Sequence, residues 1–467
     1  YNIYIYKMKI HIIGGGPTGL FIAVLCNKLN IDCEIYEKNK YIGGHHYINE
    51  ENETMHAARL ISKTFKNFFN ILNLCKIKPK MYNQKWLVNH NINTNQIFEW
   101  WYSVFIDFPL NYHKLKKTRS VDYLSKLDDN LKKYMMHVNT YIAAETNKAP
   151  ITKLLVVNLI LLMQFFKVDQ NLVNDNHWIN CIEEHLNKNK IKINKEYTIT
   201  NLDIKNNKVI SFIANEKNID LKKDDQLVMA MDPQGIIKLL ENTDIKIKNN
   251  WGNFNEFKKK LLMSTYKSIG ITIITENINQ FNNFTWITNK STYLNLTLYY
   301  YKNGYFYASI CDLNKKVNKK KIENIEPEKL KKIILKDLNN NYPEIKVKQI
   351  KFHNDAWFSN NQWNCSHTAC AQDAHVGLFE PIGNISNLQF RNSLTKGRTF
   401  IISTVETCSE AAISYINSIS EKKIKHVKHS NKRFILFIIG FGLPIIILYI
   451  LYKLIILIKN FYLEKIN

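Results

Sequence analysis

Residues 9–37 decide the fold, and they read KIHIIGGGPTGLFIAVLCNKLNIDCEIYE. A short β-branched run at residues 10–13 is followed at once by a glycine-rich turn at residues 14–19. Residues 20–29 then repeat apolar side chains at helical spacing, and a second strand pattern ends at Glu37. The order of strand, glycine turn, helix and strand predicts a βαβ unit with parallel strands.

The glycines of this turn predict a nucleotide site. Gly14 allows a tight turn, Gly16 lets the backbone approach a pyrophosphate, and Gly19 lets the helix pack closely on the strand. The pyrophosphate would then face unpaired N–H groups at the positive end of the helix dipole. Glu37 stands where a carboxylate accepts hydrogen bonds from a ribose diol. We therefore predict a Rossmann-like dinucleotide site, with an empty βαβ unit as the alternative.

A glycine pair after the second strand indicates which dinucleotide is bound. Gly43 and Gly44 follow Glu37 after a short link. In this order the segment resembles the FAD-binding fingerprint of the flavin-containing amine oxidase superfamily, which includes monoamine oxidases and L-amino-acid oxidases. The resemblance implies FAD rather than NAD as the cofactor. The Arg that often follows the glycine pair in this superfamily is replaced here by His45 and His46.

Later segments extend the resemblance. Residues 190–240 read as a β-meander followed by a strand and a turn, similar to the superfamily's return to its FAD domain. Residues 397–407 resemble its closing strand, and a helix over residues 409–419 follows with Ser409 as the N-cap. A further helix starts near Pro327. The predicted cofactor-binding residues are Gly14, Gly16, Pro17, Thr18, Gly19, Glu37, Lys38, Gly43, Gly44, Glu406 and Thr407.

Two residues are predicted to be catalytic on the same resemblance. Arg59 lies in residues 55–60, which are similar to a segment whose Arg pairs with the substrate carboxylate in amino-acid oxidases. Lys267 lies in residues 263–272, which resemble the strand of amine oxidases whose lysine contacts flavin N5 through a water. A structural Arg on a helix and an exposed strand lysine are the alternatives.

The composition limits the class of protein. The chain has 467 residues, of which 45% are hydrophobic, so it can bury sizeable cores and is neither a disordered tail nor a small disulfide scaffold. Its net charge of +24 comes from scattered lysines rather than one stripe, so no nucleic-acid partner is predicted. The eight cysteines show no CxxC pair and no regular Cys/His spacing, so no metal site is predicted.

The C-terminal region predicts a membrane anchor. Residues 434–452 contain no charged side chain and are long enough to cross a bilayer as a helix. Residues 421–433 before them are rich in lysine, so the positive-inside bias puts the large N-terminal part in the cytosol. The alternative is a hydrophobic core helix at the end of the globule.

These observations predict an α/β fold: a Rossmann-like FAD-binding domain, a discontinuous α+β substrate domain and a C-terminal transmembrane helix. The predicted bounds are 8–60, 175–245 and 365–420 for the FAD domain, 61–174 and 246–364 for the substrate domain, 421–433 for the basic segment and 434–458 for the anchor.

We expect an FAD-dependent oxidoreductase that oxidises a small amine or amino acid by hydride transfer to flavin N5, with reoxidation by oxygen. One alternative is a flavin desaturase or a protoporphyrinogen-oxidase-like enzyme that acts on a lipophilic substrate. Another is a membrane-tethered protein that binds FAD without catalysis.

Overall fold

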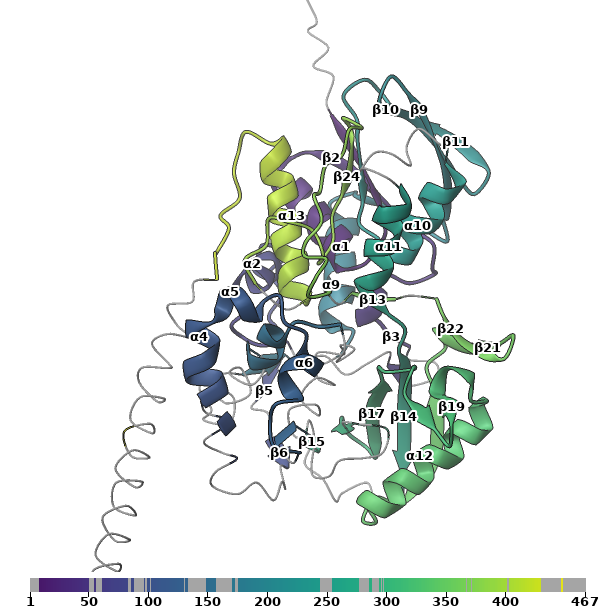
Figure 1. Cartoon of the computed structure of the whole chain (residues 1–467). Coiled ribbons are helices and arrows are strands. Elements are labelled where there is room, and N and C mark those ends of the chain that lie inside the picture. The colour runs from purple at the N-terminus through teal and green to yellow at the C-terminus, as the bar shows by residue number, and fades with distance from the viewer. Residues whose placement is uncertain are drawn as a thin grey trace, which may run out of the picture.

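The computed structural model contains two regions, which lie one above the other in Figure 1. The upper region is built around a parallel sheet and the lower region around a six-stranded, mostly antiparallel sheet. The residues that the structure describes are 8–49, 54–55, 61–82, 85–87, 96, 99–100, 102–129, 131–132, 148–156, 170–172, 175–243, 254–276, 285–287, 294, 296, 298–366, 368–370, 372–400, 403–429 and 447.

The parallel sheet has five strands in the order β24-β12-β1-β2-β8. β1 (Lys9–Ile13) is its centre and pairs with β2 (Asp32–Glu37) on one side and β12 (Gln226–Met229) on the other. β8 (Lys192–Lys195) continues the sheet beyond β2, and β24 (Leu388–Phe390) continues it beyond β12. Three chain segments that are far apart in the sequence therefore supply one sheet.

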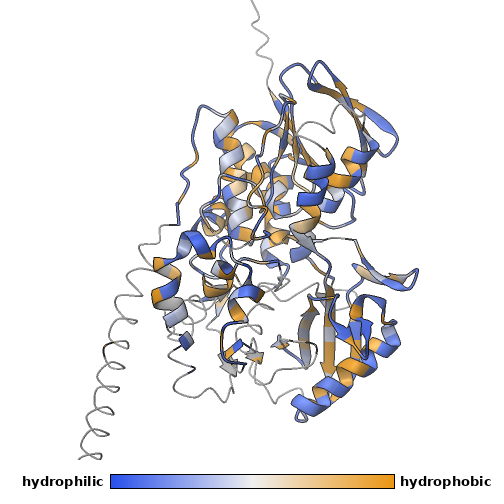
Figure 2. Ribbon diagram, in the orientation of Figure 1, coloured by the Kyte–Doolittle hydropathy of each residue, from blue (hydrophilic) through white to orange (hydrophobic). Residues whose placement is uncertain are grey.

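Helix α1 (Pro17–Leu29) lies at the centre of the upper region. Its residues 18–26 are all buried, and residues 20–26 are all apolar, as a helix with protein on every side requires; Figure 2 colours this core by hydropathy. It contacts α2 (Lys66–Leu74), α9 (His177–Lys188) and α13 (Val405–Ile419), of which α13 runs beside it in Figure 1. The position of α1 against β1 therefore sets the packing of the whole upper region.

A second layer covers the other face of the parallel sheet. Apolar side chains of β1, the meander and α10, such as Ile13, Phe212 and Leu240, share one core. The elements of this layer are β9 (Ile199–Lys205), β10 (Lys208–Ala214), β11 (Lys217–Asp220), α10 (Pro233–Asn242) and α11 (Phe254–Met263).

The lower region is a six-stranded sheet in the order β20-β14-β17-β16-β15-β6, with α12 (Pro327–Asn341) packed on it. The predicted helix start at Pro327 is confirmed. Leu330, Ile334 and Leu338 of α12 share a core with the strands. The strands are β20 (Val347–Phe352), β14 (Ile269–Thr275), β17 (Tyr305–Ile310), β16 (Leu298–Tyr300), β15 (Thr285–Ile287) and β6 (Lys85–Leu87).

Short elements connect these layers. They are β3 (Ile48–Asn49), β4 (Thr54–Met55), β5 (Met81–Tyr82), β7 (Asn171–Leu172), β13 (Thr265–Tyr266), β18 (Lys316–Val317), β19 (Lys320–Lys321), β21 (Ala356–Ser359), β22 (Gln362–Cys365), β23 (Ala369–Cys370), α4 (Phe108–Leu110), α5 (Tyr112–Leu115) and α6 (Ser120–Leu124).

The predicted α/β fold with a Rossmann-like unit is confirmed, but the end of the upper region differs from the prediction. The closing strand of the sheet is β24, whereas the described part of residues 397–404 lies outside the sheet. Thr404 rather than Ser409 caps α13, and the Ser409 hydroxyl lies inside the helix and donates to the Val405 carbonyl at 2.8 Å. The domain bounds stay a prediction.

Residues 420–429 run back over α13 and α2 and are held there by two buried carboxylates. Glu410 of α13 accepts hydrogen bonds from the backbone N–H groups of Thr399 and Phe400, both at 2.9 Å, and pairs with His426 at 3.1 Å. Burial alone would raise the pKa of the Glu410 carboxyl, but the hydrogen bonds from His426, Thr399 and Phe400 outweigh it and lower the pKa below the usual range.

We expect Glu410→Gln to lower the free energy of unfolding at pH 7 by about 1–3 kcal/mol, because the new amide cannot accept all of these hydrogen bonds. The lowered pKa means that the carboxylate stabilises the fold above the unfolded pKa of about 4.3, and that this contribution is lost as pH falls through the folded value. Denaturant unfolding should therefore show that the free energy of unfolding falls less between pH 7 and pH 3 in the variant than in wild type. Equal acid sensitivity in wild type, Glu410→Gln and the exposed control Glu421→Gln would contradict this assignment.

Within the described part of the chain, none of the helices has the length and apolar character needed to cross a membrane. The predicted anchor at residues 434–458 lies outside the described residues, except for Ile447.

Candidate functional site

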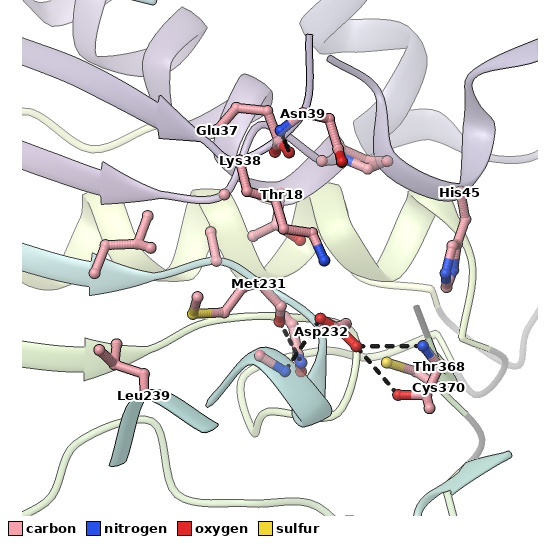
Figure 3. Close-up of a pocket in the computed structure, with 18 of the residues that line it drawn as sticks. Thr18, Glu37, Lys38, Asn39, His45, Met231, Asp232, Leu239, Thr368 and Cys370 are labelled. Carbon is pink, nitrogen blue, oxygen red and sulfur yellow. Dashed lines mark hydrogen bonds between the residues drawn. The ribbon is translucent and has the colours of Figure 1, made fainter. Parts of the chain in front are cut away.

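A cavity of about 340 Å³ opens at the carboxyl ends of β1, β2 and β12. This edge is where parallel α/β sheets bind their ligands. Figure 3 shows its walls, which come from the β1–α1 turn, the end of β2, the loop after β12 and the start of α10. Further walls are supplied by residues 44–46, 197–200, 368–370, 392–393 and 403–408.

The glycines of the β1–α1 turn have different surroundings. Gly14 has a φ of +107°, and a Cβ added there would lie 2.9 Å from the Ala230 carbonyl oxygen. A Cβ at Gly19 would lie only 2.0 Å from the Gly14 carbonyl oxygen. A Cβ at Gly16 would meet no atom within 4 Å, and Gly16 lines the cavity. The fold therefore requires glycine at Gly14 and Gly19. At Gly16 the absence of a side chain leaves space for a ligand in the cavity.

Glu37 is held rigidly at the tip of β2. It is 6% exposed, and its two oxygens accept hydrogen bonds from the backbone N–H of Gly15 at 2.7 Å and of Asn39 at 2.9 Å. Each carboxylate oxygen has a further lone pair, and the side chain lines the cavity. This arrangement suits an acceptor for a pair of hydroxyl groups.

Helices α1, α10 and α13 begin at the cavity, and of these α1 lacks a side-chain cap. The N-cap of α1 is Gly16, which offers no side-chain hydrogen bond, and the first turn of α1 contains no acidic residue. Its free N–H groups and its dipole therefore favour an anion at this point. The start of α13 also lines the cavity, but Thr404 and Thr407 already satisfy its first turn through a capping box.

One end of the cavity is apolar. Ile13, Ile199, Met231 and Leu239 line it, and the ring of Tyr36 lies 6.4 Å from that of Tyr197. Apolar walls beside a ribose acceptor suit a planar base.

The opposite end is more polar. Asp232 caps α10, and its second oxygen accepts hydrogen bonds from the backbone and the hydroxyl of Thr368, both at 3.2 Å (Figure 3). Burial raises the pKa of the Cys370 thiol to about 12 and that of Cys408 to about 11, so both thiols are neutral at pH 7 and are poor nucleophiles. Sequence reasoning did not identify any of these residues.

The structure brings most of the predicted cofactor-binding residues to the cavity. The ones that line it are Gly14, Gly16, Pro17, Thr18, Glu37, Lys38 and Gly44. Gly19 packs beneath the turn, and Gly43 packs on Ile179, whose Cδ1 would lie 2.6 Å from an added Cβ.

The predicted pair Glu406 and Thr407 has other contacts. Glu406 is fully buried and accepts hydrogen bonds from the backbone N–H of Asn67 at 3.0 Å and of Phe68 at 2.8 Å. It therefore stabilises the start of α2, and His429 pairs with the same carboxylate. The Thr407 hydroxyl bonds to the backbone of Thr404. Neither residue is among those that line the cavity.

Lys267 lies between β13 and β14, and its side chain points to the lower region. Its Nζ donates to Glu323 at 3.1 Å and to the Trp363 carbonyl at 3.3 Å. The neighbouring residue Tyr266 lines the cavity instead. Arg59 lies outside the described residues, although Met55, at the start of the segment predicted to open a helix, belongs to β4.

Comparison with known proteins agrees with this geometry. A family of NAD(P)-binding Rossmann-like domains matches residues 12–75, which include the glycine turn and Glu37. No curated protein matches the chain.

Similar solved structures cover most of the chain at low sequence identity. An engineered putrescine oxidase has a TM-score of 0.65 at 10% identity, covering 88% of this chain and 98% of its own. Cyclohexylamine oxidase from Brevibacterium oxydans has a TM-score of 0.62 at 12% identity, with 88% and 98% coverage. A fatty acid isomerase from P. acnes has a TM-score of 0.57 at 10% identity, again with 88% and 98% coverage.

The class of protein follows from these similarities together with the cavity. The chain has the fold of the flavin-containing amine oxidases and related oxidoreductases, as its sequence predicts. The relatives differ in the substrates that their names give, so the fold by itself leaves the substrate open.

Proposed function

We propose that the protein is an FAD-dependent oxidoreductase that removes a hydride from the carbon next to the nitrogen of an amine or amino acid. The observation that carries the proposal is the open space at Gly16, between an uncapped helix start and the fixed carboxylate of Glu37. A dinucleotide fits this space. Its diphosphate needs a close approach to the backbone and an anion site, and its ribose needs an acceptor for a pair of hydroxyl groups.

The residues of the cavity would hold the two ends of FAD differently. Glu37 would accept hydrogen bonds from the ribose, and the turn at Gly16 with the start of α1 would face the diphosphate. The apolar end between Ile199 and Leu239 would cover the adenine, which leaves the end near Tyr266 for the flavin ring. When bound, the flavin supplies the two-electron acceptor and its reoxidation by oxygen. The protein itself orients the substrate and excludes water.

The absorption spectrum of the purified full-length chain tests this proposal. We expect a yellow protein whose flavin bands are bleached under anaerobic conditions by an amine or an amino acid, and restored by air. Bleaching only by a lipophilic porphyrinogen or a similar compound would instead support the desaturase alternative. A protein that stays colourless after incubation with FAD would contradict the proposal.

The contacts of Lys267 favour one further candidate function, a membrane-tethered protein that binds FAD without catalysis. In the superfamily that the chain resembles, this lysine contacts the flavin, but here it is paired with Glu323. A retained flavin that no amine, amino acid or porphyrinogen bleaches would support this candidate.

The predicted role of Lys267 has its own test. From its contacts we expect Lys267→Met to leave the rate of flavin bleaching within about twofold of wild type, since exposed or paired lysines away from a site act weakly on it. The matched control is Glu323→Gln, which breaks the same ion pair from its other end. A fall of a hundredfold or more in Lys267→Met alone would restore the predicted catalytic role.

We also propose that residues 434–458 anchor the protein in a membrane with the catalytic part in the cytosol, and the support for this is the uncharged sequence and its basic flank. Alkaline extraction of cell membranes should leave the full chain in the pellet and release a chain that ends at residue 433. Release of both chains would contradict the anchor.

A further inference from the structure

A second cavity of about 500 Å³ lies beside α5, on the other side of the segment that leads into α13. Lys116, Lys117 and His375 form an exposed rim. Arg398 lines the same cavity, together with Thr152 and an apolar wall made of Pro150, Val376, Leu378 and Phe400.

Arg398 is the cation of this cavity that lies inside the rim. Its guanidinium donates to Gln372 Oε1 at 2.6 Å and to Ser403 Oγ at 3.4 Å. Among the described residues no carboxylate forms an ion pair with it. Burial lowers its pKa to about 10, so it remains charged at pH 7. This partly buried guanidinium donates hydrogen bonds only to neutral groups, so it has further N–H donors for an anion.

A buried lysine lies near Arg398. Lys153 is 2% exposed, and its Nζ donates to the Gln372 carbonyl at 3.5 Å. Burial, and then the charge of Arg398, lower the pKa of Lys153 well below its usual range. Two neighbouring carboxylates are engaged elsewhere: Asp373 accepts from the backbone N–H of His375, and Glu410 accepts from Thr399 and Phe400.

Thr152 supplies an independent observation. Its side chain is fully buried and lines the cavity, and its Oγ1 has no hydrogen-bond partner among the residues that the structure describes. An unpartnered buried hydroxyl destabilises the fold, so a hydrogen bond from a polar group of a ligand would relieve that cost.

We propose that the second cavity binds an organic anion, with its acidic group on Arg398 and Thr152 and its apolar body against Phe400 and Leu378. The planar guanidinium suits a carboxylate or a phosphate monoester, and the apolar wall suits a hydrocarbon body. Ser403, which bonds to Arg398, lines the first cavity. As an anion site the proposal stands alone, whereas its use as a substrate site beside the flavin rests on the proposed function.

Calorimetric titration of the full chain tests the site, and the probes are octanoate, octyl phosphate, octanamide and octylamine. We expect octanoate or octyl phosphate to bind at least about tenfold more tightly than octanamide or octylamine, since a buried Arg strongly favours an ionised partner. Whichever of the two anions binds more tightly identifies the head group. Equal affinity for the anions and octanamide would overturn the proposal.

Two variants locate the binding. Arg398→Gln should weaken the binding of octanoate or octyl phosphate by about tenfold or more, while the distant exposed control Lys205→Gln should leave the affinity unchanged. Thr152→Val keeps the shape of the side chain but removes the hydroxyl, so it should weaken the binding of the anion several-fold. Its Tm should be equal to that of wild type or higher, because the hydroxyl that it removes is unsatisfied. A purely structural Thr152 would lower Tm without changing affinity, and that result would overturn its assignment.

The titration separates this proposal from the proposed function. It gives a result whether or not the preparation contains flavin, so a colourless protein that binds octanoate through Arg398 would support the anion site alone. A yellow protein that does not bind either anion would retain the proposed function and overturn the anion site.

Discussion

Gly19→Ala is expected to destabilise the protein by about 3 kcal/mol or more, at the upper end of what overpacking of a core costs. The added Cβ would lie 2.0 Å from the Gly14 carbonyl oxygen, and the Ile12 Cγ2 lies 3.2 Å away on the same side. The turn cannot yield easily, because the Gly14 N–H donates a hydrogen bond to the Tyr36 carbonyl of β2 at 2.8 Å. α1 would have to move off β1, and it is buried against α2, α9 and α13.

Denaturant unfolding of the flavin-free protein, followed by circular dichroism, measures this loss, and Gly16→Ala is the matched control in the same turn. Gly16 has a φ of −73°, which any residue can adopt, and space for a Cβ. We expect the control to lie within about 0.5 kcal/mol of wild type, as substitutions at open positions do. A Gly19→Ala variant as stable as the control would show that α1 does not pack on the turn as closely as described.

The βαβ unit could be predicted from sequence because its causes are local. The strand, the glycines, the helix and Glu37 lie within residues 9–37, and the contact that requires Gly19 is with the Gly14 carbonyl of the same turn. The closing strand could not be predicted in the same way. β24 has three residues, too few for an alternation pattern, and its place depends on pairing with β12 far away in the sequence.

The site shows the same division between local and distant causes. Gly14, Gly16 and Glu37 were found from their spacing, whereas Asp232, Thr368 and Asn392 meet at the cavity only through the tertiary fold. Lys267 shows how sensitive such predictions are to register. Adjacent residues of an extended chain point to opposite sides, so Tyr266 faces the cavity and Lys267 faces Glu323.

Gly16→Val should abolish flavin binding while the fold persists. Its side chain would extend into the space beside the uncapped start of α1, where the diphosphate is expected to approach the backbone. The backbone there is extended and accepts a β-branched residue, so the main effect is steric exclusion of the ligand. The smaller substitution Gly16→Ala should weaken the binding of FAD by about tenfold, which corresponds to the loss of roughly 1.4 kcal/mol of binding free energy.

Flavin content after purification and the dissociation constant from FAD titration measure this effect, and the unfolding midpoint of flavin-free protein serves as the control. The affinity for FAD should fall in the order wild type, Gly16→Ala, Gly16→Val, while the unfolding midpoint of the flavin-free protein stays the same. This pattern distinguishes steric exclusion of FAD at Gly16 from a general loss of structure. Full flavin occupancy in Gly16→Val would mean that the diphosphate does not lie over this glycine, and the assignment of the first cavity to FAD would then fail even if the protein were yellow.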